Sequence, residues 1–102
     1  MIYEIDIMIG TGLNIQYDVI IIPKRQIIYI NDQKYKIPQS FIDELKKTIY
    51  LWDENYGYDN KIDTEEFKIT VKSDDGIKKY QGKGHYPNNY GLLKEMLGSI
   101  HE

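Results

Sequence analysis

Apolar and polar residues alternate along most of the first 37 residues, and this pattern limits the possible folds more than any other feature of the sequence. From residue 3 to residue 9 every second residue is apolar, with Glu4 and Asp6 between them. The same alternation returns from residue 15 to residue 21. Because successive side chains of a strand point to opposite faces, both stretches are predicted to be strands with one buried face. The composition agrees, since 18 isoleucines and 10 tyrosines, with no alanine, favour strands.

Turn-forming residues divide this region into four strands. Gly10-Thr11-Gly12 has the backbone freedom that a hairpin turn needs. Pro23 ends the second strand, because proline has no N–H to donate to a neighbouring strand. Asn31-Asp32-Gln33 predicts a tight turn between two shorter strands, Gln26–Ile30 and Lys34–Ile37. An antiparallel meander of up to four strands is therefore expected.

The apolar period lengthens after Pro38, which indicates a helix. Ser40 is a suitable N-cap for this helix, and the helix is expected to end near Asp53. Apolar residues recur at spacings of three and four, as on the buried stripe of an amphipathic helix. They are Ile42, Leu45, Ile49 and Trp52.

Alternation resumes at Phe67–Val71, and Asp74-Asp75-Gly76 predicts a hairpin turn into a strand at Ile77–Gln81. A final helix is expected after Asn88 or Asn89, and its apolar positions are Leu92, Leu93, Met96, Leu97 and Ile100. The order ββββ-α-ββ-α predicts an α+β fold with two layers, in which both helices pack on one face of an antiparallel sheet. Residues 1–102 are expected to form a single domain.

Charge and composition exclude several classes of protein. The net charge of −3 argues against nucleic acid as a partner, since such binders carry a basic excess. The chain has no cysteine, which excludes disulfides and thiolate metal sites. Its longest apolar run, Val19–Ile22, is far shorter than the roughly 20 residues of a membrane helix, and no basic leader pattern opens the sequence. We therefore expect a cytoplasmic protein without a membrane partner and without a cofactor.

Aromatic and acidic residues are interleaved after the first helix, and this segment is the predicted contact with a partner protein. Aromatic side chains with polar tips are enriched at interfaces. The expected contact residues are Trp52, Tyr56, Tyr58 and Asp59. Trp52 and Tyr56 have an alternative role, which is to close the core.

Charge is divided along the chain in a way that suits the same hypothesis. Residues 43–66 hold eight acidic and three basic residues, whereas residues 67–94 hold six lysines and two aspartates. Such a dipole can steer a charged partner, although neighbouring elements of one chain can also compensate each other in this way.

The loop Gly82–Asn89 suggests a different function. Its two early glycines follow a strand and precede a helix, as in loops that hold phosphate. The residues that would contact a small ligand or anion there are Lys83, His85, Tyr86 and Asn88. A minor enzyme that uses His85 as a general base belongs to the same alternative. However, Pro87 takes the place of the third glycine of a dinucleotide fingerprint, so the motif is incomplete.

The second half of residues 55–66 resembles an EF-hand calcium loop. The eighth, ninth and twelfth positions of such a loop would be held by Ile62, Asp63 and Glu66. The resemblance implies oxygen ligands at Asp63 and Glu66, but Asn55 and Gly57 stand where the first and third ligands belong. A strand pattern follows the loop where an EF-hand needs a helix, and no metal site is predicted.

Together these observations favour a small, non-enzymatic protein of a bacterium or mobile element that acts by protein–protein interaction. An immunity, inhibitor or adaptor protein is the expected type. The abundance of isoleucine, lysine, asparagine and tyrosine is typical of an AT-rich genome. Small-ligand binding at the Gly82–Asn89 loop is the alternative, and self-association into a homo-oligomer is a third hypothesis.

Overall fold

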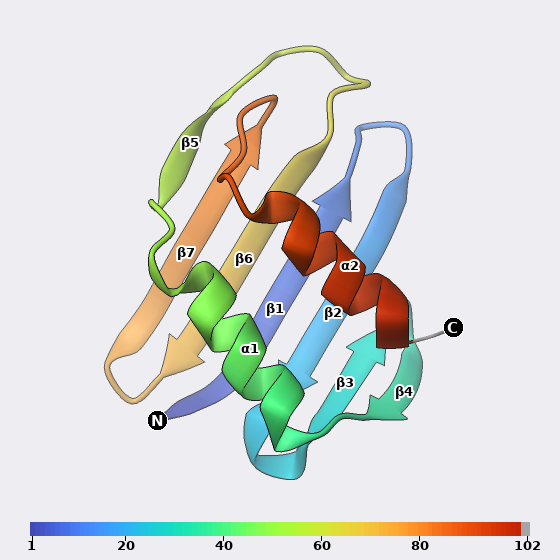
Figure 1. Cartoon of the computed structure of the whole chain (residues 1–102). Coiled ribbons are helices and arrows are strands. Elements are labelled where there is room, and N and C mark those ends of the chain that lie inside the picture. Colours follow the sequence, from blue (N-terminus) through green and yellow to red (C-terminus); the bar gives the residue numbers. More distant parts are fainter. Residues whose placement is uncertain (101–102) are drawn as a thin grey trace.

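Seven strands form one sheet in the computed structural model of the chain, which describes residues 1–100. The order of strands across the sheet is β4-β3-β2-β1-β6-β7-β5 (Figure 1). The strands are β1 (Ile2–Gly10), β2 (Ile15–Ile22), β3 (Ile27–Ile30), β4 (Gln33–Lys36), β5 (Asn55–Tyr58), β6 (Glu66–Ser73) and β7 (Gly76–Lys83). The helices are α1 (Gln39–Tyr50) and α2 (Tyr90–Ile100), and a short 3-10 turn spans Pro23–Arg25.

The predicted meander is confirmed as the four strands β1 to β4, each antiparallel to the next. β1 is the central strand, because it also pairs with β6 on its other side. Its alternation has the expected effect: Ile5, Ile7 and Ile9 are at most 1% exposed, while Glu4 and Asp6 point to the opposite face.

The sheet is larger than predicted, and it is mixed, whereas an antiparallel sheet was expected. The additional strand is β5, which lies at the edge and runs parallel to β7. Only two residue pairs define its register, Asn55 with Gln81 and Tyr58 with Lys83. So short a strand, with a glycine inside it, has no alternation long enough to reveal it. α1 crosses from the β4 edge to this opposite edge, which is why β5 enters parallel to β7 (Figure 1).

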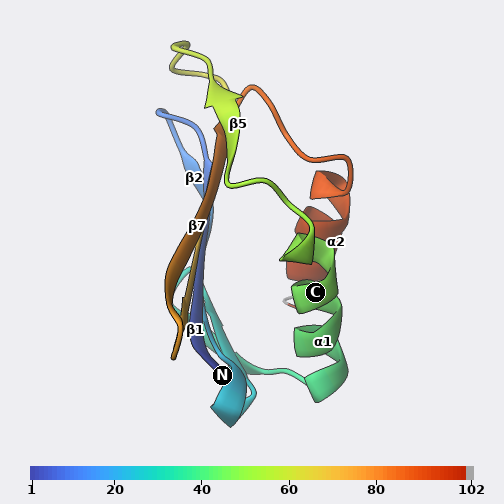
Figure 2. The same ribbon diagram turned by 90° about the vertical axis from the view of Figure 1, so that its left-hand side faces the viewer.

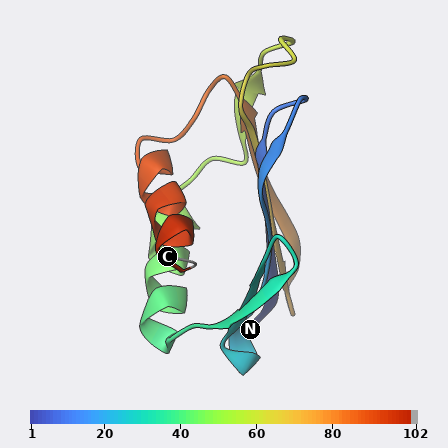
Figure 3. The same ribbon diagram turned by 90° about the vertical axis from the view of Figure 1, so that its right-hand side faces the viewer.

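Both helices pack on the same face of the sheet, as predicted (Figures 2 and 3). The core fills the space between the two layers, and its most deeply buried side chains are Ile5, Ile7, Ile9, Val19, Ile21, Ile28, Ile42, Leu45, Phe67, Ile69, Leu93 and Leu97. Within residues 1–100, neither helix has the length and apolar character needed to span a bilayer.

The predicted ends of α1 are wrong at both sides. Pro38, in extended conformation, is the N-cap, and no side chain caps the helix, so Ser40 lies inside the first turn. The helix ends at Tyr50 rather than near Asp53. Trp52 is nevertheless buried, because the chain turns after Tyr50 and places the indole against the sheet.

An aromatic cluster joins the two layers at one end of the molecule. Phe67 of β6 is fully buried at its centre, and the rings around it belong to four different segments of the chain. Their centroids lie 5.1–6.3 Å from that of Phe67, and they are Trp52, Tyr56, Tyr86 and Tyr90.

We predict that Phe67→Ala will lower the free energy of unfolding by about 3–5 kcal/mol, because it opens a cavity that four rings border. Urea unfolding followed by circular dichroism measures the loss. Tyr50→Ala is the control, since Tyr50 is 76% exposed and its truncation should change stability by less than about 0.5 kcal/mol. An equal loss of stability in both variants would contradict the placement of Phe67 at the centre of the cluster.

Candidate functional site

Within residues 1–100, both helices lie on one face of the sheet, and the other face has no helix over it (Figures 2 and 3). The side chains that alternate away from the core lie on this second face. We call this surface the open face. The strand registers arrange its central residues in rows that cross the strands. One row runs Lys34, Tyr29, Ile20, Asp6, Thr70, Lys79. The next has two parts, Lys36, Ile27, Ile22 on one side and Glu4, Lys72, Ile77 on the other. Extending the register of Ile5 with Ile21 by one residue brings the two parts into line.

Tyr58 stands at one corner of the open face, beside a shallow hollow. Its side chain is 67% exposed, and the Nζ atom of Lys83 lies 5.0 Å from the centre of its ring. The hollow has a volume of about 270 Å³, and its walls come from β5, β6 and β7: Asn55, Gly57, Tyr58, Glu66, Lys68, Gln81 and Gly82. We call these residues, with Lys83, the Tyr58 corner.

Backbone hydrogen bonds fix the position of Tyr58. The N–H of Asp59 donates to the carbonyl of Lys83 at 2.9 Å, directly after the register pair of Tyr58 and Lys83. The Asp59 side chain then accepts a hydrogen bond from the N–H of Lys61, which begins the turn that follows. The exposed tyrosine therefore lies at the end of a hydrogen-bonded strand.

Gly57 is the residue of β5 that cannot be replaced without strain. Its φ of +117° lies in the region that favours glycine, and a Cβ at this position would stand 2.9 Å from the His85 ring. The close approach of His85 to β5 is thus possible because the chain has glycine there.

The four residues predicted to contact a partner do not share one surface. Trp52 is 6% exposed and its Nε1 donates to the Asn89 side chain, so it belongs to the core. Tyr56 is half-buried against Phe67, and its hydroxyl accepts from the N–H of Asp53. Asp59 is half-buried and Tyr58 is exposed. Trp52 and Tyr56 therefore have the alternative role considered from the sequence, since their side chains pack in the core.

The four residues of the alternative ligand site are also separated. Lys83 is the last residue of β7, it is 7% exposed, and it shares the open face with Glu66. Tyr86 packs on the helix side of the sheet, where its ring stacks on Tyr90 at 4.7 Å. His85 and Asn88 are exposed. Lys83 and Tyr86 therefore lie on different sides of the sheet. Ligand binding by this loop stays a prediction.

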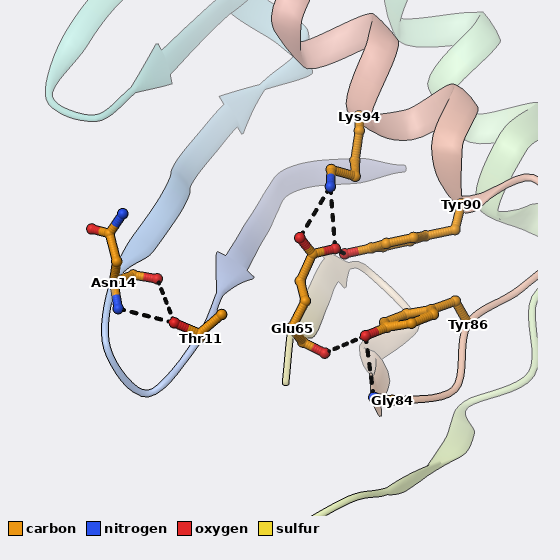
Figure 4. Close-up of polar contacts among 7 residues, drawn as sticks. All are labelled: Thr11, Asn14, Glu65, Gly84, Tyr86, Tyr90 and Lys94. Atoms are coloured by element: carbon orange, nitrogen blue, oxygen red, sulfur yellow. Dashed lines mark hydrogen bonds and ion pairs between the residues drawn. The ribbon is translucent and has the colours of Figure 1, made fainter. Parts of the chain in front are cut away.

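Glu65 anchors the loop that the sequence marked as a ligand site. Its side chain accepts a hydrogen bond of 2.6 Å from the Tyr90 hydroxyl and pairs with Lys94 at 3.0 Å, while its carbonyl accepts from the Tyr86 hydroxyl at 2.7 Å (Figure 4). Burial raises the pKa of the Tyr90 hydroxyl above its usual range, and the Glu65 carboxylate adds to this. Tyr90 therefore stays a hydrogen-bond donor. No local pattern in the sequence predicts this contact, because its partners lie 25 positions apart.

The segment that resembles a calcium loop connects two strands. Asn55 lies in β5 and Glu66 in β6, where it faces Lys83 and stands 3.9 Å from Lys68. In the described part of the chain, no three His, Cys, Asp or Glu residues are placed to hold a metal ion.

A compact charge cluster occupies the centre of the open face. Lys72 of β6 lies 2.8 Å from the Glu4 carboxylate and 3.2 Å from that of Asp6. The second oxygen of Asp6 is buried without a hydrogen bond from residues 1–100. Burial raises the pKa of the Asp6 carboxyl, and the Glu4 carboxylate raises it further. By contrast, the hydrogen bond from Lys72 lowers the pKa of Glu4.

The fold and the surface define a small α+β domain with one covered and one open sheet face. No protein-family model matches the chain, and neither a curated protein nor a solved structure shows significant similarity to it. The open face is therefore the part of the molecule on which the proposed function rests.

We predict that Asp6→Asn stabilises the protein at pH 7 and that the gain disappears as the pH falls to about 3. A carboxyl whose pKa is raised by folding favours the folded state only when protonated, so above that pKa the ionised Asp6 opposes folding. Because a third of this side chain is exposed, 34%, the gain should stay below about 1 kcal/mol.

Thermal unfolding at low micromolar protein, repeated from pH 3 to pH 8, provides the measurement. Glu4→Gln is the matched control and should have the opposite sign at neutral pH, because Glu4 ionises more easily in the folded protein. A destabilising effect of Asp6→Asn at pH 7 would contradict the prediction.

Proposed function

We propose that this chain acts by binding another protein and not by catalysing a reaction, as an immunity, inhibitor or adaptor protein. The observation that carries the proposal is the Tyr58 corner, where an exposed tyrosine stands beside a hollow on the open face. Tyrosine is enriched among the residues that dominate binding energy, because it buries a large area and loses few rotamers.

The chemistry of the corner suits a partner with both apolar and polar groups. Tyr58 offers an apolar ring with a hydroxyl at its tip, and the Lys83 ammonium lies 5.0 Å from the centre of this ring. Lys68, Glu66 and Gln81 surround the hollow with both charges and an amide. A hydrophobic anchor within a polar rim is the usual composition of a protein interface.

A preformed surface also supports the proposal. The strand ends that carry Tyr58 and the hollow are tied to the sheet by backbone hydrogen bonds, as described for Asp59 and Lys83. Binding would then cost little conformational entropy beyond the tyrosine side chain itself.

We predict that Tyr58→Ala abolishes recovery of the physiological partner in an affinity purification from the source cells. Truncation of a hot-spot tyrosine typically weakens binding by about 2 kcal/mol, or roughly thirtyfold. Tyr50→Ala is the matched control, since Tyr50 is also largely exposed but lies on α1, on the other side of the sheet. Equal recovery of every bound protein by wild type and both variants would refute the proposed surface.

A further inference from the structure

A second part of the open face carries a patch of apolar side chains that is independent of the Tyr58 corner. Ile20 and Ile22 of β2 lie beside Tyr29 and Ile27 of β3, respectively, in two adjacent rows. Ile20 is 41% exposed, although a solvent-facing strand position usually holds a polar residue.

Opposite charges border this patch on its two sides. Beyond β3, the same rows continue to Lys34 and Lys36 of β4, which form no ion pair within the described residues. Beyond β2, the first row continues to Asp6 of β1, and extending the register of Ile5 with Ile21 by one residue places Glu4 beside Ile22 in the second. The two carboxylates share a single lysine, Lys72, so this side keeps an excess of negative charge.

From this arrangement we infer that the open face binds a second copy of the same chain, through a two-fold axis that runs parallel to the strands midway between β2 and β3. Such an axis exchanges β2 with β3 and β1 with β4 while it keeps the rows in line. Tyr29 then faces Ile20 of the second copy, and Ile27 faces its Ile22. At the borders, Lys34 meets Asp6 and Lys36 meets Glu4.

The contact is self-complementary in the placement of its apolar residues and in the placement of its charges. Apolar positions meet apolar positions at the centre, and each lysine meets a carboxylate at the rim, twice over because of the symmetry. Two sheets packed face to face lie about 10 Å apart, a spacing that the long lysine side chains at the rim can bridge.

The size of the contact sets the expected affinity. Four strands and two rows give about eight residues per copy, well below the roughly 20–30 of a standard interface. We therefore expect a weak and reversible dimer that forms at high micromolar concentration and weakens as salt screens the lysine–carboxylate pairs.

Sedimentation equilibrium of the full chain, from about 10 µM to 1 mM at low salt, tests the inference. The average mass should rise from 12.1 kDa toward twice that value. Ile20→Asp should raise the dissociation constant at least about tenfold. Ile77→Asp is the matched control: Ile77 is 63% exposed on the same face, but it lies outside the overlap and its substitution should change nothing.

A charge exchange gives the decisive comparison. Lys34→Glu and Asp6→Lys should each remain monomeric alone, because each brings like charges together across the axis. Mixed in equal amounts, they should form a heterodimer, since Glu at position 34 then meets Lys at position 6 and the remaining Lys34 meets Asp6. Circular dichroism of each variant checks that it is folded.

A protein that stays at 12.1 kDa up to 1 mM would overturn the inference and leave the patch to a different partner. A dimer that Ile77→Asp disrupts as strongly as Ile20→Asp would overturn it as well. Neither result affects the Tyr58 corner, whose test does not involve β2 or β3.

Discussion

Burial of Phe67 is the interaction on which the arrangement of this protein depends. The ring lies on β6, and it is enclosed by side chains that reach it from the turn after α1, from β5, from the loop after β7 and from the start of α2. Because the apolar surface of all of them is removed from water together, the helices are held to one face of the sheet and the edge strand β5 is held in place.

The one-sided cover explains where a function can reside. α1 and α2 both lie on one face of the sheet, so within residues 1–100 no helix lies over the opposite face (Figure 2). Antiparallel sheets tolerate this when their outward residues are polar. Here the outward rows mix isoleucine and tyrosine with paired and unpaired charges, and this composition supports the proposed interfaces.

Local patterns in the sequence predicted the fold where the elements are long, and failed where position is set by distant contacts. The alternation around Ile5 and the spacing of Ile42 and Leu45 correctly predicted β1 and the buried stripe of α1. β5 was missed because it is paired to β7 across 26 residues and has almost no pattern of its own. For the same reason Trp52 and Tyr56 could not be distinguished from surface aromatics: their burial is decided by Phe67, which no local pattern connects to them. Tyr58 is exposed at a strand end, and its contact with a partner stays a prediction.

The two surfaces on the open face are compatible with each other. In the proposed dimer, the axis between β2 and β3 places each copy's β1 to β4 under the other, whereas β6, β7 and β5 extend beyond the overlap. The Tyr58 corners then lie at the two far ends of the pair, both facing solvent. A partner with two matching sites, or two partners held close together, would be bound with the avidity of a linked pair, so even a weak dimer would increase retention. Strand order alone produces this separation, because the apolar patch and the exposed tyrosine belong to opposite halves of the same sheet.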